Sequence, residues 1–125
     1  MPRLLIIIGI GGFLGSVTRY LLTNFVNNYL SSNFPYGTLA VNILGCFLIG
    51  IFVGLFDRGN ILSPEWRLFL ATGFCGGFTT FSTFSYENIK LTQSAEFFNL
   101  SLNVAASVFL GFAATYLGML IIKSI

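Results

Sequence analysis

The stretch Gly73–Phe84, with the sequence GFCGGFTTFSTF, decides how this chain folds. It places three glycines within five residues and follows them with hydroxyl-bearing and β-branched side chains, a combination of poor helix propensity. The stretch nevertheless lies in the middle of an apolar segment long enough to cross a bilayer. We therefore expect a broken helix here, made of two short helices joined at residues 76–79, with helical structure resuming near Phe78. Broken backbone at membrane depth is tolerated only where protein or a cavity surrounds it.

The composition around this stretch is that of a membrane protein. Of the 125 residues, 55% are hydrophobic and 8% are charged, against roughly 25% charged in an ordinary soluble domain. So few charges cannot cover a water-exposed surface. Apolar segments of spanning length occupy about 4–25, 37–56, 66–89 and 97–122. We predict an all-α integral membrane protein, with one membrane domain over residues 1–125 and four transmembrane helices, the third broken near its middle.

The basic residues predict the orientation of the chain. Four spans place both termini on one side, which would hold Arg3, Arg58, Arg67 and Lys123, with Lys90 opposite. The positive-inside rule favours the cytoplasm for the richer side. We expect a multi-pass protein of the cell inner (plasma) membrane. The net charge of +2 is small and dispersed, which excludes a nucleic-acid partner.

Small residues recur at four-residue spacing in every span, and such ridges let helices approach closely in lipid. Any one pair is explained by packing within the chain, but the full set favours a tightly packed bundle or an oligomer. The pattern comprises Gly11 and Gly15, then Cys46, Gly50 and Gly54, then Gly73 and Gly77, and finally Ser107 and Gly111.

Polar residues inside the spans are costly, so each predicts a partner or a water-filled path. Arg19 lies six residues from the end of the first span, where it could serve a functional site or extend to the nearby surface. Thr38 and Asn42 share one face of the second span, and Asn103 and Ser107 share one face of the fourth. Either pair could be a hydrogen bond between helices or part of a polar path.

If helix resumes near Phe78, the third span carries two different stripes. Phenylalanines would form one arc and hydroxyl groups the opposite one. The phenylalanines could simply face lipid or the core. Together, however, the hydroxyls, the amides and the positive edges of aromatic rings suit a small, strongly hydrated anion. Few formal charges would let the anion leave again. The arcs would contain Phe78, Phe81 and Phe84 on one side and Thr79, Ser82, Thr83 and Tyr86 on the other.

Three motifs together cover essentially the whole chain. They are Gly11-Gly12-x-x-Gly15-x-x-x-Arg19-Tyr20, Gly37-Thr38-Leu39-x-Val41-Asn42-x-x-Gly45 and, most specifically, Gly73–Phe84. In this combination they resemble the Fluc/CrcB family of small fluoride ion channels. The resemblance implies passive export of fluoride by a homodimer of four-span subunits inserted antiparallel, with two pores along the subunit interface. The bias of basic residues in this chain departs from the balance that antiparallel insertion favours.

The resemblance also implies which residues line the pore. Ring edges, one amide and several hydroxyls would hold the dehydrated fluoride. The matching positions in this chain are Phe81, Phe84, Asn42, Thr38, Thr83 and Ser107.

Two further roles follow from the resemblance. Arg19 matches a basic residue of the vestibule. The backbone carbonyls of Gly76 and Thr79 match those that hold a structural sodium ion at the centre of the dimer. Sodium would then be the only cofactor, and the partners would be fluoride, a second copy of the chain and the lipid bilayer.

Two other readings of the sequence compete with a channel. A small four-span, proton-coupled multidrug transporter needs a membrane-embedded carboxylate, and the first span carries Arg19 instead. A structural membrane subunit would explain the glycine ridges but not the hydroxyl and phenylalanine stripes. We do not expect an enzyme, because no nucleophile, base and metal set can be assembled from these residues.

Overall fold

The computed structural model of the chain describes residues 1–59 and 62–125. Within these residues three continuous helices are long and apolar enough to cross a membrane. They are α1 (Pro2–Tyr29), α2 (Tyr36–Phe56) and α6 (Phe97–Ser124). All three expected continuous spans are therefore present, each reaching slightly beyond its predicted bounds.

The remaining crossing is broken, as the glycine-rich stretch predicted. It begins with α3 (Pro64–Arg67), continues as the π-helix η1 (Leu68–Cys75) and the short α4 (Gly76–Phe78), and resumes as α5 (Ser82–Gln93). Ser63 caps its start by accepting a hydrogen bond from the Trp66 N–H at 3.4 Å. The wider π turns were not predicted.

The position of the break differs from the prediction. Gly76 and Gly77 are helical, and the interruption falls at residues 79–81, so helix resumes at Ser82 and not near Phe78. The physical reason is that Gly77 serves packing. A Cβ atom built on Gly77 would lie 2.6 Å from the carbonyl oxygen of Gly12 in α1. The glycines thus permit a close helix contact, and the threonines after them leave the helix.

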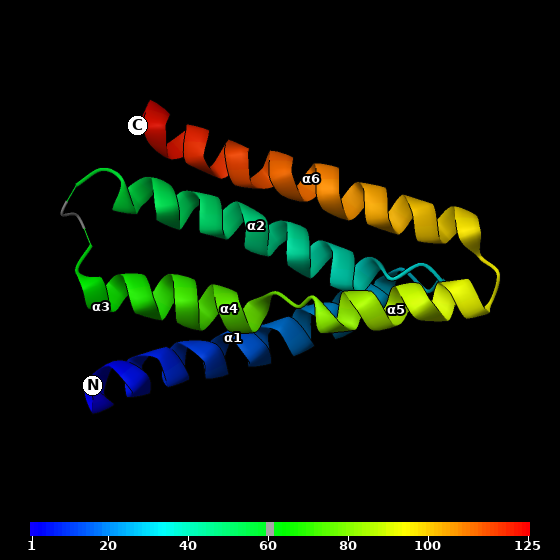
Figure 1. Ribbon diagram of the computed structural model, residues 1–125, viewed down its shortest axis with the longest axis horizontal. Coiled ribbons are helices and arrows are strands. Elements are labelled where there is room, and N and C mark those ends of the chain that lie inside the picture. Colours follow the sequence, from blue (N-terminus) through cyan, green and yellow to red (C-terminus); the bar gives the residue numbers. More distant parts are fainter. Residues whose placement is uncertain (60–61) are drawn as a thin grey trace.

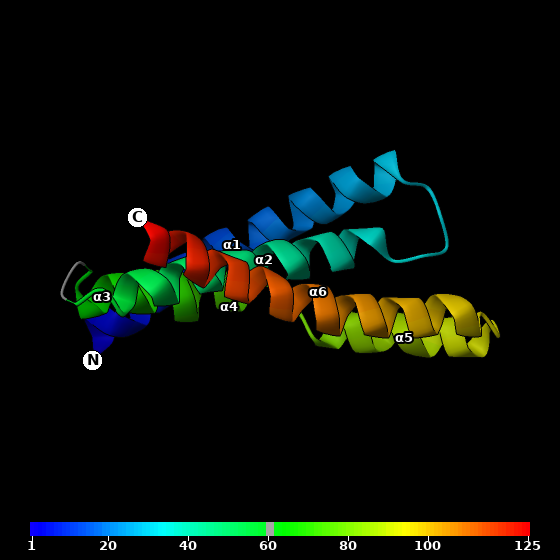
Figure 2. The ribbon, with the colours of Figure 1, turned by 90° about the horizontal axis from the view of Figure 1, so that it is seen from above.

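The helices form an antiparallel bundle whose two termini lie at the same end, beside α3 (Figure 1). This agrees with an even number of crossings. Helix α2 packs along α6, and α1 packs along η1 and α4. Helix α5 and the C-terminal part of α1 overlap in Figure 1 but lie on opposite sides of α2 in Figure 2.

Small residues make these contacts possible, as their spacing predicted. A Cβ atom on Gly11 would lie 2.6 Å from the Phe69 carbonyl oxygen of η1, and one on Gly73 would lie 2.9 Å from the Ile8 carbonyl oxygen of α1. Only backbones without side chains can approach this closely. Large apolar side chains such as Phe109 and Phe112 are exposed on the outside of the bundle, where a soluble protein would carry polar groups.

Candidate functional site at the helix break

An open groove with a volume of about 530 Å³ runs past the break, between α2, the third crossing and α6. It brings together most of the site residues that the sequence analysis predicted. Its lining includes Asn42, Gly76, Thr79, Phe81, Phe84 and Ser107. Thr38 and Thr83 are not among its lining residues.

The Asn42 side chain replaces the backbone hydrogen bonds that the break removes. Its Nδ2 donates to the carbonyl oxygen of Thr80 at 3.0 Å, and its Oδ1 accepts from the N–H of Thr80 at 2.9 Å. A side-chain amide carries both a donor and an acceptor, so it can pair with the N–H and the carbonyl of one residue in this way. Asn42 therefore fixes the position of the break relative to α2, whatever else it binds.

Two threonines satisfy further groups at the break. The Thr79 hydroxyl donates to the Cys75 carbonyl oxygen at 2.9 Å, one turn earlier. The Thr80 hydroxyl accepts from the Thr83 N–H and donates to the Thr83 hydroxyl, both at 3.2 Å. The Thr80 hydroxyl thus caps the first turn of α5, and the Thr83 hydroxyl is held by it.

These contacts leave two carbonyl oxygens without their helical donors. In a continuous α-helix the Gly76 carbonyl would accept from the Thr80 N–H, and the Thr79 carbonyl from the Thr83 N–H. Here the Thr80 N–H donates to Asn42 and the Thr83 N–H donates to the Thr80 hydroxyl. The Gly76 and Thr79 carbonyls are the two that the resemblance nominated for sodium.

The predicted phenylalanine arc is wrong, because the break separates its members. Phe78 precedes the break, is only 1% exposed and stacks on Phe74 with ring centroids 5.6 Å apart. Phe81 lies within the break and is 78% exposed. Phe81 and Phe84 stay together, with centroids 5.8 Å apart, and both line the groove. Phe78 belongs to the core and is not part of the site.

Arg19 contacts the first half of the broken helix. Its Nε donates to the carbonyl oxygen of Gly77 at 3.0 Å. This carbonyl is near the C-terminal end of a helix, where the helix dipole favours a positive charge. The side chain is therefore directed to the break.

Glu87 is a hydrogen-bond partner of the predicted site residue Thr38, and the sequence analysis did not predict it. Thr38 is buried, and its hydroxyl donates to Glu87 Oε2 at 3.0 Å. The other carboxylate oxygen, Oε1, is buried and lacks a hydrogen-bond partner among the described residues. The signal that could have revealed Glu87 is its spacing, because it lies four residues after Thr83, on the same face of the helix.

The two polar residues of α6 have separate roles. Asn103 is 1% exposed, and its Nδ2 donates to the Asn88 Oδ1 of α5 at 2.7 Å, which is a hydrogen bond between helices. One turn later the Ser107 hydroxyl is buried beside the groove and has no partner among the residues described. A free hydroxyl at this depth can donate to a bound ion.

Comparisons with known proteins agree with this arrangement. The family model for "CrcB-like protein, Camphor Resistance (CrcB)" matches residues 6–119. A Flavobacterium psychrophilum protein named "Fluoride-specific ion channel FluC" is 50% identical over 118 residues, which cover 94% of this chain and 95% of that protein. Proteins of the same name from Geobacter sulfurreducens and Campylobacter jejuni are 50% identical over 113 residues and 44% identical over 123. These matches cover 90% and 98% of this chain, and 91% and 100% of the relatives.

Proposed function

The chain belongs to the CrcB-like family, a family of ion channels and not of enzymes, and we propose that it is a passive, fluoride-selective channel exporting fluoride from the cytoplasm. The observation that carries the proposal is the groove at the break. It combines the Phe81 and Phe84 rings, the Asn42 amide and the Ser107 hydroxyl, which has no partner among the described residues. Neutral donors of this kind replace the water around a small anion without trapping it.

We propose that the working channel is a homodimer of antiparallel subunits, with two pores along their interface. The supporting feature is that the groove is open on one side and that Phe81 is 78% exposed at its edge. A second copy would cover this side and give each pore residues from both chains. The proposed location is the inner membrane of the cell.

The fluoride path would also use the remaining predicted residues, Thr38, Thr83 and Arg19. Thr38 would present its hydroxyl beside the Glu87 carboxylate, and Thr83 would lie between this pair and the Phe81 ring. Arg19 would place a positive charge near the vestibule while it holds the Gly77 carbonyl.

A structural sodium ion at the dimer centre fits the donors present. The Gly76 and Thr79 carbonyl oxygens have lost their helical N–H donors to other groups, and a hard cation prefers oxygen ligands. When bound, sodium would offset the partial negative charge of the carbonyls that face it from the two subunits. The residues of this chain would hold it through backbone atoms alone.

The deciding experiment is ion efflux from liposomes that contain the purified protein. We expect rapid fluoride efflux, no chloride efflux, and no dependence on an imposed proton gradient. Equal leakage of the two anions, or none of either, would overturn the proposal. Fluoride movement driven by the proton gradient would instead favour a coupled transporter that uses the embedded Glu87 carboxylate.

The pore assignment has its own test. Replacing Phe81 or Asn42 should lower fluoride efflux while the variant protein remains dimeric in size-exclusion chromatography. Wild-type efflux from both variants would remove these residues from the pore and leave the fluoride assignment standing.

A further inference from the structure

A second groove lies far from the break, at the end of the bundle that holds both termini. Its volume is about 540 Å³, and it lies between the start of α1 and the start of the third crossing. Its lining consists of Arg3, Ile7, Ser63, Glu65, Trp66 and Phe69. None of these residues takes part in the proposed fluoride path.

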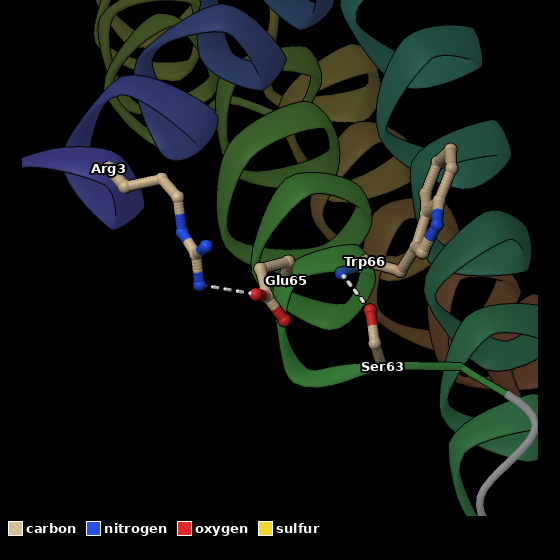
Figure 3. Close-up of polar contacts among 4 residues, drawn as sticks. All are labelled: Arg3, Ser63, Glu65 and Trp66. Carbon is tan, nitrogen blue, oxygen red and sulfur yellow. Dashed lines mark hydrogen bonds and ion pairs between the residues drawn. The ribbon is translucent and has the colours of Figure 1, made fainter.

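The rim of this groove carries one charge of each sign. Figure 3 shows the Arg3 guanidinium reaching from α1 to the Glu65 carboxylate at the start of α3, with Nη2 and Oε2 2.7 Å apart. The Arg3 side chain is 76% exposed and that of Glu65 36%. An exposed pair of this kind contributes little to stability. The guanidinium has further N–H donors available, and the second carboxylate oxygen can still accept hydrogen bonds.

The floor of the groove is apolar and lies at one end of the expected membrane spans. Ile7 and Phe69 come from the membrane-spanning parts of α1 and η1. Trp66 is 54% exposed and packs edge-on against Phe69, with ring centroids 5.7 Å apart. A tryptophan at the end of a span is the usual anchor at the membrane interface. A molecule that fills the groove therefore meets hydrocarbon on one side and an ion pair on the other.

We propose that this groove binds a zwitterionic aminophospholipid, with its phosphate on Arg3, its ammonium on Glu65 and an acyl chain along Ile7 and Phe69. A guanidinium donates to phosphate oxygens in a fixed geometry. The carboxylate accepts from a primary ammonium, whereas a choline group has no N–H to donate. A purely anionic headgroup would satisfy Arg3 but would be repelled by Glu65.

Trp66 makes this proposal measurable, because it is the only tryptophan in the chain. The full-length protein is placed in phosphatidylcholine vesicles, in which a fraction of the lipid is replaced by a lipid with brominated acyl chains that quench tryptophan. Brominated phosphatidylethanolamine, phosphatidylcholine and phosphatidylglycerol are compared. We expect half-maximal quenching at a mole fraction of phosphatidylethanolamine about threefold lower than that of either other lipid. This is the preference that one charge-assisted contact at an exposed site supplies.

Variants distinguish lipid bound in the groove from other lipid that contacts Trp66. Arg3→Gln and Glu65→Gln should each abolish the preference, whereas Lys123→Gln, which removes an exposed charge at the same end, should retain it. Equal quenching by all three lipids in the wild-type protein, or strongest quenching by phosphatidylglycerol, would overturn the proposal. So would a preference that survives in both groove variants. The measurement does not depend on fluoride conduction, so its result is independent of the proposed channel function.

Discussion

The two halves of the third crossing are held in place by different interactions. Before the break, η1 and α4 lie against α1 through backbone contacts at glycine, including Gly77 on Gly12 and Gly73 on Gly11. After the break, α5 has a single buried residue, Leu91. It is held instead by side-chain hydrogen bonds that Thr38 donates to Glu87 and Asn103 donates to Asn88.

This difference separates a rigid part of the site from an adaptable part. A contact between two backbones leaves no room for a side chain, so one added methyl group disturbs the whole helix pair. A hydrogen bond between side chains in a membrane protein contributes about 0.6 kcal/mol on average and rarely more than about 1.7 kcal/mol. Single substitutions should therefore be severe before the break and graded after it.

The largest expected effect tests the rigid half with two neighbouring glycines. Gly77→Ala should destabilise the protein by about 2–3 kcal/mol, because the new Cβ would meet the Gly12 carbonyl oxygen at 2.6 Å. Gly76→Ala is the matched control, since its Cβ would find its nearest neighbour, the Ala71 carbonyl oxygen, at 3.9 Å, and its backbone is helical. Equilibrium unfolding in detergent measures both. Equal losses of stability would contradict the packing argument.

The next effect is expected at the junction of the two halves. Asn42→Leu removes both hydrogen bonds to Thr80 and should cost about 1–2 kcal/mol, as well as most of the fluoride efflux. Asn42→Asp keeps an acceptor for the Thr80 N–H but loses the donor to its carbonyl. Its carboxylate also places a charge inside a span, facing the Thr80 carbonyl oxygen, so its stability should fall at least as far as that of Asn42→Leu. A wild-type unfolding midpoint for Asn42→Leu would show that the amide does not hold the break.

A smaller effect is expected within the adaptable half. Thr38→Val keeps the shape of the side chain but removes the hydrogen bond to Glu87, which should cost about 1 kcal/mol. Thr38→Ser keeps the hydroxyl and should recover most of this loss. Fluoride efflux is measured alongside unfolding, and we expect it to follow the hydroxyl and not the methyl group. Efflux that is lower in the serine variant than in the valine variant would exclude this order.

The smallest change in stability is expected at Ser107. Its hydroxyl has no partner among the described residues, so Ser107→Ala should leave the free energy of unfolding within about 0.5 kcal/mol of the wild type. Fluoride efflux should nevertheless fall if this hydroxyl donates to the ion. A loss of stability without a loss of efflux would mean that Ser107 is only a packing residue.

The spans and the existence of the break could be predicted because composition and glycine content report on them directly. Where the break falls could not be predicted, because the glycines that indicated it serve the close contact with α1 and remain helical. The predicted phenylalanine arc failed for the same reason, since a shift of the break by a few residues sends Phe78 to the core and leaves Phe81 exposed.

The polar residues of the site could be nominated from the sequence, but their partners could not. Asn42 was recognised as an amide in a span, whereas its reciprocal pairing with the Thr80 backbone depends on where the third crossing breaks. Glu87 was not predicted, because it lies near the end of an expected span, where a carboxylate does not by itself indicate a functional site. Its contact with Thr38 joins residues 49 positions apart in the sequence.

The weak hydrophobicity of α5 bears on how the chain is built into the membrane. This helix carries Glu87, Asn88 and Lys90 within a few residues, and an isolated segment of that kind enters hydrocarbon at a cost of several kcal/mol. The groups that donate hydrogen bonds to it are Thr38 on α2, which is synthesised earlier, and Asn103 on α6, which is synthesised later. We therefore expect α5 to settle at its final depth only after the translocon has released the last helix, so that the site is completed at the end of biogenesis.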